Sequence, residues 1–310
     1  MAGCFTHIMV AKKLVEESRN FNSGQLLGLS RIMRKWSNYV MLGAVSPDMP
    51  YLALASEWAD KFHYVKTAEI IRRGIRGLFN KSFDDVADQK CLAWLLGYAS
   101  HVVTDLYIHP IIEKCVGPYA KNKRAHRKCE MSQDVFIVKH KLGLTLCKCE
   151  LLDHTIKTCT ETGEEAGFAG TPGLDPVIVN FWTGLLIAVY GKDPAPSPDR
   201  WFIRFSAAID KFSENSRKFP FVTRTILSKG VGLVYPTTPK KSFVEGLVQP
   251  IGNAKNFDKI FDADVAKVVE IVKEIQSAIR SSDDSLFTLP DGNLDTGMRL
   301  DDISKSIFWA

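Results

Sequence analysis

Asp84 to Val116, with the sequence DDVADQKCLAWLLGYASHVVTDLYIHPIIEKCV, decides the fold. Apolar residues dominate this stretch on all sides, as is typical of a helix buried in a protein core. A proline inside a helix removes a hydrogen bond, so a kink is expected near His109-Pro110. Within the stretch, His101, Asp105 and His109 stand at positions i, i+4 and i+8. This spacing stacks three ligand-type side chains on one face of a helix over two turns.

The neighbours of these three residues are apolar, which indicates that their face looks into the core. A charged or polar side chain buried there is costly unless it has a partner. A divalent metal ion supplies one, and zinc is favoured by imidazole nitrogens together with carboxylate oxygens. The stretch therefore predicts a zinc site on a core helix.

Further candidate ligands lie on either side of this helix. His126 and Glu130 repeat the i, i+4 spacing, and Asp134 extends the row by one turn as a candidate acceptor that orients His126 or a neighbouring residue. Asp48 ends the segment Gly43-Ala-Val-Ser-Pro-Asp48, on a turn just after a predicted helix. Two single histidines complete the set: His7 and His63. Taken singly, each is explained as well by packing or by a solvated surface pair, and it is their combination that indicates a metal site.

Helical spacing also dominates the rest of the chain, whereas strand signals are scarce, so the predicted fold class is all-α. The predicted helices are 5–18, 25–45, 67–79, 84–116, 121–142, 177–190, 200–215 and 263–280. A loop rich in glycine and proline runs from Thr160 to Pro176. It predicts a division into a metal-binding region, 1–160, and a helical C-terminal region of unassigned role, 176–310.

Composition excludes several classes of protein. The 310 residues carry a net charge of +5 without a dense Lys/Arg block, so there is no specific nucleic-acid signal. No run of apolar residues is long enough for a transmembrane segment. The first twenty residues lack the pattern of a signal peptide, and seven cysteines show no disulfide framework, so a cytoplasmic location is expected.

A separate metal hypothesis concerns Cys147, Cys149, His154 and Cys159. Their spacing matches none of the usual structural zinc patterns, so reduced thiols are the favoured interpretation.

The order of these motifs resembles the zinc-dependent phospholipase C family, which is related to the fungal single-strand-specific nucleases. The resemblance covers roughly residues 4 to 140. It is carried by Thr6-His7, Gly43-Ala-Val-Ser-Pro-Asp48, His63, Leu96-Gly-Tyr-Ala-Ser-His101, Asp105, His109-Pro110 and His126-x3-Glu130-x3-Asp134.

The resemblance implies a phospholipase C/nuclease-like zinc-binding helical domain, followed here by a helical C-terminal extension. It implies up to three Zn²⁺ ions per chain. One would be held by Asp48, His63, His101 and Asp105, a second by His109, His126 and Glu130, and a third by His7 with Asp105 as a bridge. In the family, the amine and carbonyl of the first mature residue complete the third site. Ala2 stands five positions before His7, so removal of Met1 would give Ala2 that role.

The predicted activity is phosphodiester hydrolysis by a metal-activated water, with Asp48 as general base or water orienter. The substrate would be a phospholipid or another phosphodiester, with possible peripheral contact with a membrane surface. No nucleophile elbow or phosphate-cradling loop suggests a different chemistry.

Two alternatives remain open. A nuclease or a phosphomonoesterase could use the same metal core. A lipid enzyme should show an exposed apolar rim near the site, whereas a nuclease should show a basic groove with stacking aromatic residues. The second alternative is a non-catalytic, metal-stabilised binding protein.

Overall fold

The computed structural model describes residues 3–21, 24–146, 155–164, 172–218 and 235–309. Helices account for almost all of its regular structure, so the all-α prediction is confirmed. The α-helices are α1 (Cys4–Glu17), α2 (Gly24–Lys35), α3 (Ser37–Val45), α4 (Met49–Leu52), α5 (Ser56–Tyr64), α6 (Glu69–Gly77), α7 (Val86–Val116), α8 (Tyr119–Leu142), α9 (Pro176–Tyr190), α10 (Pro198–Lys218) and α12 (Phe257–Ser281). A short antiparallel hairpin pairs β1 (Gly292–Asn293) with β2 (Met298–Arg299).

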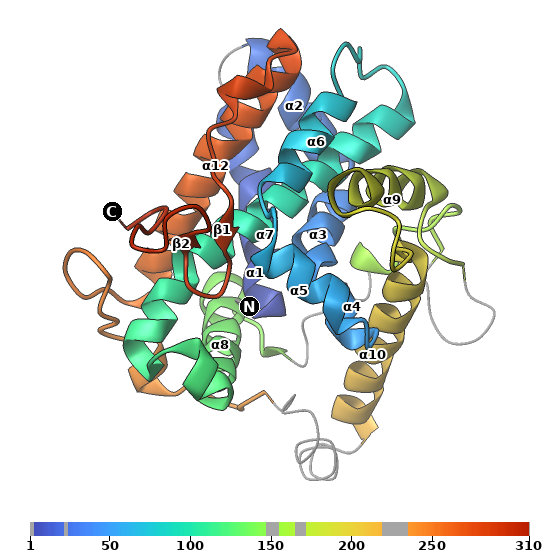
Figure 1. Cartoon of the computed structure of the whole chain (residues 1–310). Helices are drawn as coiled ribbons and strands as arrows, with labels where there is room; N and C mark the ends of the chain where they lie inside the picture. Colours follow the sequence, from blue (N-terminus) through green and yellow to red (C-terminus); the bar gives the residue numbers. More distant parts are fainter. Residues whose placement is uncertain (1–2, 22–23, 147–154, 165–171, 219–234, 310) are drawn as a thin grey trace.

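Helix α7 is the centre of the molecule, as its composition predicts. Every residue from Cys91 to Ile112 is buried, and the other helices pack around it. Figure 1 shows α12 on one side of α7 and α9 and α10 on the other. The side chain of Asp85 caps the start of α7 by accepting from Ala87 N, and Gly117 ends it with φ of 87°. Within the described residues, α7 has the length and hydropathy of a membrane span, but its apolar window is wholly buried, as in a core helix.

The closest packing lies between α3 and α7, where two glycines face each other's helix. A Cβ on Gly97 would lie 1.9 Å from Val40 O, and a Cβ on Gly43 would lie 2.1 Å from Trp94 O. A real Cβ cannot approach an oxygen so closely, so only glycine allows this backbone contact. The two glycines therefore fix how near α3 lies to the helix that carries the predicted zinc ligands.

Several helix boundaries differ from those predicted. The segment 25–45 forms two helices because the backbone leaves helical geometry at Trp36, with φ of −114° and ψ of 38°. The chain between Asp48 and Tyr64 forms α4 and α5, which were not predicted. Helix α7 runs through Pro110 as one helix.

The division into residues 1–160 and 176–310 stays a prediction. Residues of α9, α10 and α12 belong to the same hydrophobic core as those of α1, α3 and α7. The second region thus packs directly on the helices that carry the candidate ligands.

Candidate metal centre

Asp105 lies at the middle of the predicted ligand set and is fully buried. Its two carboxylate oxygens face different histidines. Oδ2 lies 3.2 Å from His101 Nε2, whereas Oδ1 lies 3.2 Å from His109 Nε2. The i, i+4, i+8 spacing on α7 therefore places both imidazoles against the same carboxylate, one on each side.

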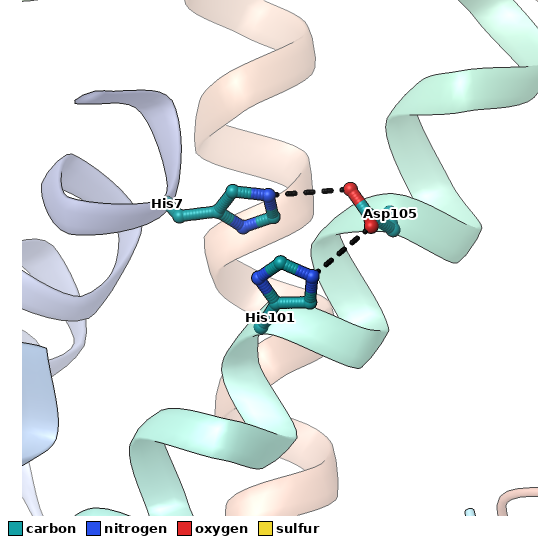
Figure 2. A group of neighbouring side chains, drawn as sticks. All are labelled: His7, His101 and Asp105. Carbon is teal, nitrogen blue, oxygen red and sulfur yellow. Dashed lines mark ion pairs between the residues drawn. The ribbon is translucent and has the colours of Figure 1, made fainter. Parts of the chain in front are cut away.

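The first cluster joins α1 to α7. His7 Nε2 lies 3.2 Å from Asp105 Oδ1, and the His7 ring stacks on the His101 ring with centroids 3.9 Å apart. Figure 2 shows His7 and His101 pointing at the two different oxygens of Asp105. One ligand atom from each of the three residues lies within 4.8 Å of the others, so the group could hold a metal ion.

The second cluster consists of Asp48, His63 and His101. His63, from α5, places Nε2 3.3 Å from Asp48 Oδ1 and 3.8 Å from Asp105 Oδ2. Asp48 Oδ1 also lies 3.9 Å from His101 Nε2. Asp48 ends a 3-10 turn after α3, so this cluster depends on the close packing of α3 against α7.

The third cluster joins α7 to α8 through His109, His126 and Glu130. Glu130 Oε1 lies 3.1 Å from His126 Nε2 and 3.7 Å from His109 Nε2. His126 and Glu130 share a face of α8 because they are four residues apart. All three side chains are buried.

Backbone carbonyls orient three of the histidines. His63 Nδ1 lies 2.7 Å from Ala59 O, His101 Nδ1 lies 2.9 Å from Ala44 O, and His109 Nδ1 lies 2.5 Å from Leu294 O. A carbonyl can only accept, so each Nδ1 carries the hydrogen and the neutral ring keeps its lone pair on Nε2. Each Nε2 points into the clusters, as in metal sites whose ligands are fixed by an outer hydrogen bond.

The donor set fits zinc. Ligand atoms about 2.1 Å from one tetrahedral ion lie about 3.4 Å apart, which is close to the separations found here. Nε2 of His7, His63, His101, His109 and His126 is buried without a hydrogen-bond partner among the residues that the structure describes. Unpartnered nitrogens aimed at carboxylates in a core are costly unless an ion joins them.

Electrostatics favours the protonation states that metal binding needs. Burial lowers the pKa of His109 to about 4, so its imidazole is neutral at pH 7. Burial acts to raise the pKa of Asp105, but His109, His101 and His7 around it hold that pKa well below its ordinary value. Asp105 is therefore ionised.

The structure brings together eight of the nine predicted ligands, whereas Ala2 lies outside the described residues. Cys147, Cys149 and His154 of the separate metal hypothesis also lie outside them, and Cys159 is a buried free thiol. Within the described residues, the hydrogen bonds of Asp134 go to α1 and to Tyr235, not to His126. Asp134 accepts from Thr6 N and from Thr6 Oγ1, at 2.7 Å each, and so holds the start of α1 beside His7.

The site also contains residues outside the predicted ligand set, of which Tyr119, Leu294 and Asp295 were missed from the sequence. Tyr51 and Tyr119 line it, with ring centroids 5.4 Å from His63 and 5.0 Å from His126. Leu294 and Asp295 reach it from the C-terminal part of the chain, and Tyr64 donates a short hydrogen bond to Asp295 Oδ2. A backbone carbonyl such as that of Leu294 carries no sequence signal. The Asp291-Gly-Asn-Leu-Asp-Thr-Gly297 turn pattern was the available hint.

A buried carboxylate shared between histidine clusters from several helices defines an all-helical protein with three groups of side chains that could each hold a metal ion. Comparison with known families agrees, since the model of the family described as zinc-dependent phospholipase C matches residues 6–168, just over half of the chain. The chain belongs to the zinc-dependent phospholipase C family, whose members are hydrolases of phosphoester bonds. No curated protein and no solved structure matches the chain.

Proposed function

We propose that the protein is a zinc-dependent phosphodiester hydrolase that acts on phospholipids in the manner of a phospholipase C. The observation that carries the proposal is that the two carboxylate oxygens of Asp105 face different histidines. Oδ2 faces His101, whereas Oδ1 faces His7 and His109. A carboxylate with different partners on its two oxygens is suited to bridge two metal ions about 3.5–4 Å apart, the spacing used to displace phosphate esters.

Three zinc ions account for the whole donor set. The first would be held by Asp48, His63, His101 and Asp105 Oδ2, and the second by His109, His126 and Glu130. His7 and Asp105 Oδ1 would hold the third. The amine and carbonyl of Ala2 are the proposed remaining ligands of that third ion.

Zinc, when bound, polarises phosphoryl oxygens and makes a bound water acidic enough to ionise near neutral pH. Asp48 is proposed to orient that water and accept its proton, because it is the most exposed of the described candidate ligands, at 7%. Burial alone would raise the pKa of Asp48, but the neighbouring His101 and His63 lower it by more than burial raises it. The pKa of Asp48 therefore lies below its ordinary value. An ionised carboxylate at the open edge of the centre suits a ligand that also holds a water.

The support for a lipid substrate and peripheral membrane contact is one exposed apolar residue beside the site, Leu54. Leu54 is 87% exposed and adopts a strained positive φ of 56°. Its N–H donates to the carbonyl of Tyr51, which lines the site. Exposed basic residues follow Tyr119 on the other side: Lys121, Lys123 and Arg124. An exposed apolar side chain beside Tyr51 and a cation beside Tyr119, where Lys123 Nζ lies 5.5 Å from the ring centroid, suit an anionic phospholipid surface.

The activity test measures diacylglycerol released from phospholipid vesicles by protein loaded with zinc, after chelation, and after zinc is restored. Asp48→Asn is expected to lose about 10²-fold or more in rate while the fold survives. Asp262→Asn, an exposed carboxylate on α12, is the matched control and should keep full activity. Cleavage of single-stranded nucleic acid or of phosphomonoesters instead of lipid would select the alternative hydrolases. Zinc binding without turnover of any of them would indicate a binding protein.

Membrane contact is tested by vesicle sedimentation, which does not depend on turnover. Leu54→Asp should weaken binding to anionic vesicles. Val86→Asp, which changes an exposed apolar residue in the first turn of α7, should leave binding unchanged. Equal binding of the two variants to vesicles would show that Leu54 does not contact the membrane.

The role of Ala2 is tested by comparing a native start with a chain that carries a few extra N-terminal residues. The extension should lower zinc content from about three ions towards two and cut activity, because a blocked amine cannot ligate. Equal zinc content would show that Ala2 is not a ligand. The cytoplasmic location stays a prediction, to be checked by fractionation of cells that express the protein.

A further inference from the structure

A segment far from the other candidate ligands in sequence closes one side of the metal centre. This segment, residues 291–297, contributes the Leu294 carbonyl that accepts from His109 Nδ1 at 2.5 Å. Leu294 N donates to the carbonyl of His63 at 2.9 Å. One residue therefore contacts a candidate ligand of the third cluster and the backbone of a candidate ligand of the second.

Further contacts hold the 291–297 segment against the helices of the site. Asp291 Oδ1 accepts from Ala68 N at 2.8 Å and from Glu69 N at 3.2 Å, at the start of α6. Gly292 exchanges two hydrogen bonds of 2.9 Å with Thr67 Oγ1. These bonds join the segment to α6, and the Leu294 bonds join it to α5 and α7.

We propose that the 291–297 segment is an integral part of the zinc centre, and that its docking and zinc binding at His109 are thermodynamically coupled. The proposal rests on the zinc proposed above for His109, His126 and Glu130. Leu294 fixes the ring orientation and tautomer of His109, so it is a positioning residue. Losing such an outer hydrogen bond typically lowers metal affinity about 10- to 100-fold. Coupling is reciprocal, so zinc must stabilise the docked segment by the same factor.

Gly297 offers a way to displace the segment without touching a ligand. Its φ is +68°, and a Cβ there would lie 2.4 Å from Pro110 Cγ and 2.7 Å from Leu106 O on α7. Gly297→Ala must therefore move the segment away from α7. Gly143→Ala is the matched control, because Gly143 also has φ of +68° but has no atom within 4 Å of a Cβ. Both variants carry the same backbone strain, and only the first creates the clash.

The first measurement is zinc affinity by competition with a chelator, together with zinc content by mass spectrometry. Gly297→Ala is expected to bind one zinc about 10- to 100-fold more weakly than wild type, whereas Gly143→Ala should match wild type. Equal zinc affinity in all three proteins overturns the proposal. A wild-type protein that binds no zinc would instead refute the proposed function.

The second measurement needs no variant and so does not depend on whether Gly297→Ala folds. Hydrogen exchange of the wild-type 291–297 amides is compared with and without zinc. The Leu294 amide should exchange about 10- to 100-fold faster after chelation, by reciprocity. The amides near Ile275 in the middle of α12, a fully buried position, serve as the internal reference. Identical exchange of the Leu294 amide in the two states overturns the coupling.

Discussion

Replacing Gly97 with alanine is predicted to disturb the metal centre from a position that contains no ligand. The new Cβ would lie 1.9 Å from Val40 O, whereas contacts below 3.0 Å are essentially never found, so the two helices must separate by at least about 1.1 Å. His101 Nδ1 on α7 is hydrogen bonded across the same helix pair to Ala44 O on α3, at 2.9 Å. A shift of this size along that bond lengthens it beyond hydrogen-bonding range.

Two costs add up in this variant. Overpacking a tight core costs about 1–3 kcal/mol. Leaving the buried His101 Nδ1 donor without its acceptor costs about 1–3 kcal/mol more. Gly97→Ala should therefore lower the free energy of unfolding by about 2–6 kcal/mol, and loss of the oriented ring should weaken zinc binding about 10- to 100-fold.

The assay is denaturant unfolding of zinc-loaded protein combined with measurement of zinc content. Gly184→Ala in α9 is the matched control, because Gly184 lies in a helix with no atom within 4 Å of a Cβ. It should raise stability by about 0.5–1 kcal/mol, as alanine does in an exposed helix. A Gly97→Ala protein with wild-type stability and full zinc content would refute the claim that the α3–α7 contact sets the ligand geometry.

Three further predictions concern stability. Chelating zinc should lower the thermal midpoint of unfolding. Adding zinc at about 100 times its dissociation constant should restore about 2.7 kcal/mol of folding stability. An unchanged midpoint on chelation would show that the described clusters bind no ion. Asp134→Ala should lower the free energy of unfolding by about 2–4 kcal/mol and reduce zinc content, because Asp134 caps the start of α1 beside His7. Full zinc content in this variant would show that the cap does not affect metal binding. Burial raises the pKa of Asp264 to about 8, so between about pH 4 and 8 the folded protein holds a proton that the unfolded chain has released, and stability falls as pH rises. Asp264→Asn should flatten that fall and stabilise the protein by a few kcal/mol at pH 8, and an unchanged pH profile of unfolding would contradict the shift.

The sequence was most informative where the chemistry lies on regular helices. His101, Asp105 and His109 share one face of α7 because helical periodicity requires it, and the same holds for His126 and Glu130 on α8. Because a long apolar helix is buried on all sides, its composition predicted that the face with these three residues lies in the core. The all-α fold was predictable on the same grounds, whereas family membership was predictable from the resemblance carried by the order of the motifs.

The parts that escaped prediction are those that depend on tertiary contacts. Helices α4 and α5 are too short for a clear hydrophobic period, although α5 delivers His63. Gly43 and Gly97 were noted only as parts of motifs, whereas a glycine inside an apolar helical pattern indicates close backbone approach. Asp134 was expected to orient His126 or a neighbouring residue, whereas it accepts from the start of α1, a tertiary contact that helical spacing does not reveal. The contribution of Leu294 is a backbone atom and could not be predicted from residue identity.

The position of Leu294 in the chain has a consequence for biosynthesis. The first described candidate ligand is His7, and the carbonyl that orients His109 belongs to residue 294, so the residues from 7 to 294 must all leave the ribosome before the centre is complete. Helices α1 to α8 are made early, and domains commonly begin to fold during synthesis. A nascent chain can thus collapse around α7 while His109 still lacks its acceptor. If zinc binds as proposed, its acquisition at His109 is then expected to be a late step in maturation, because the orienting carbonyl appears only once residue 294 has been made.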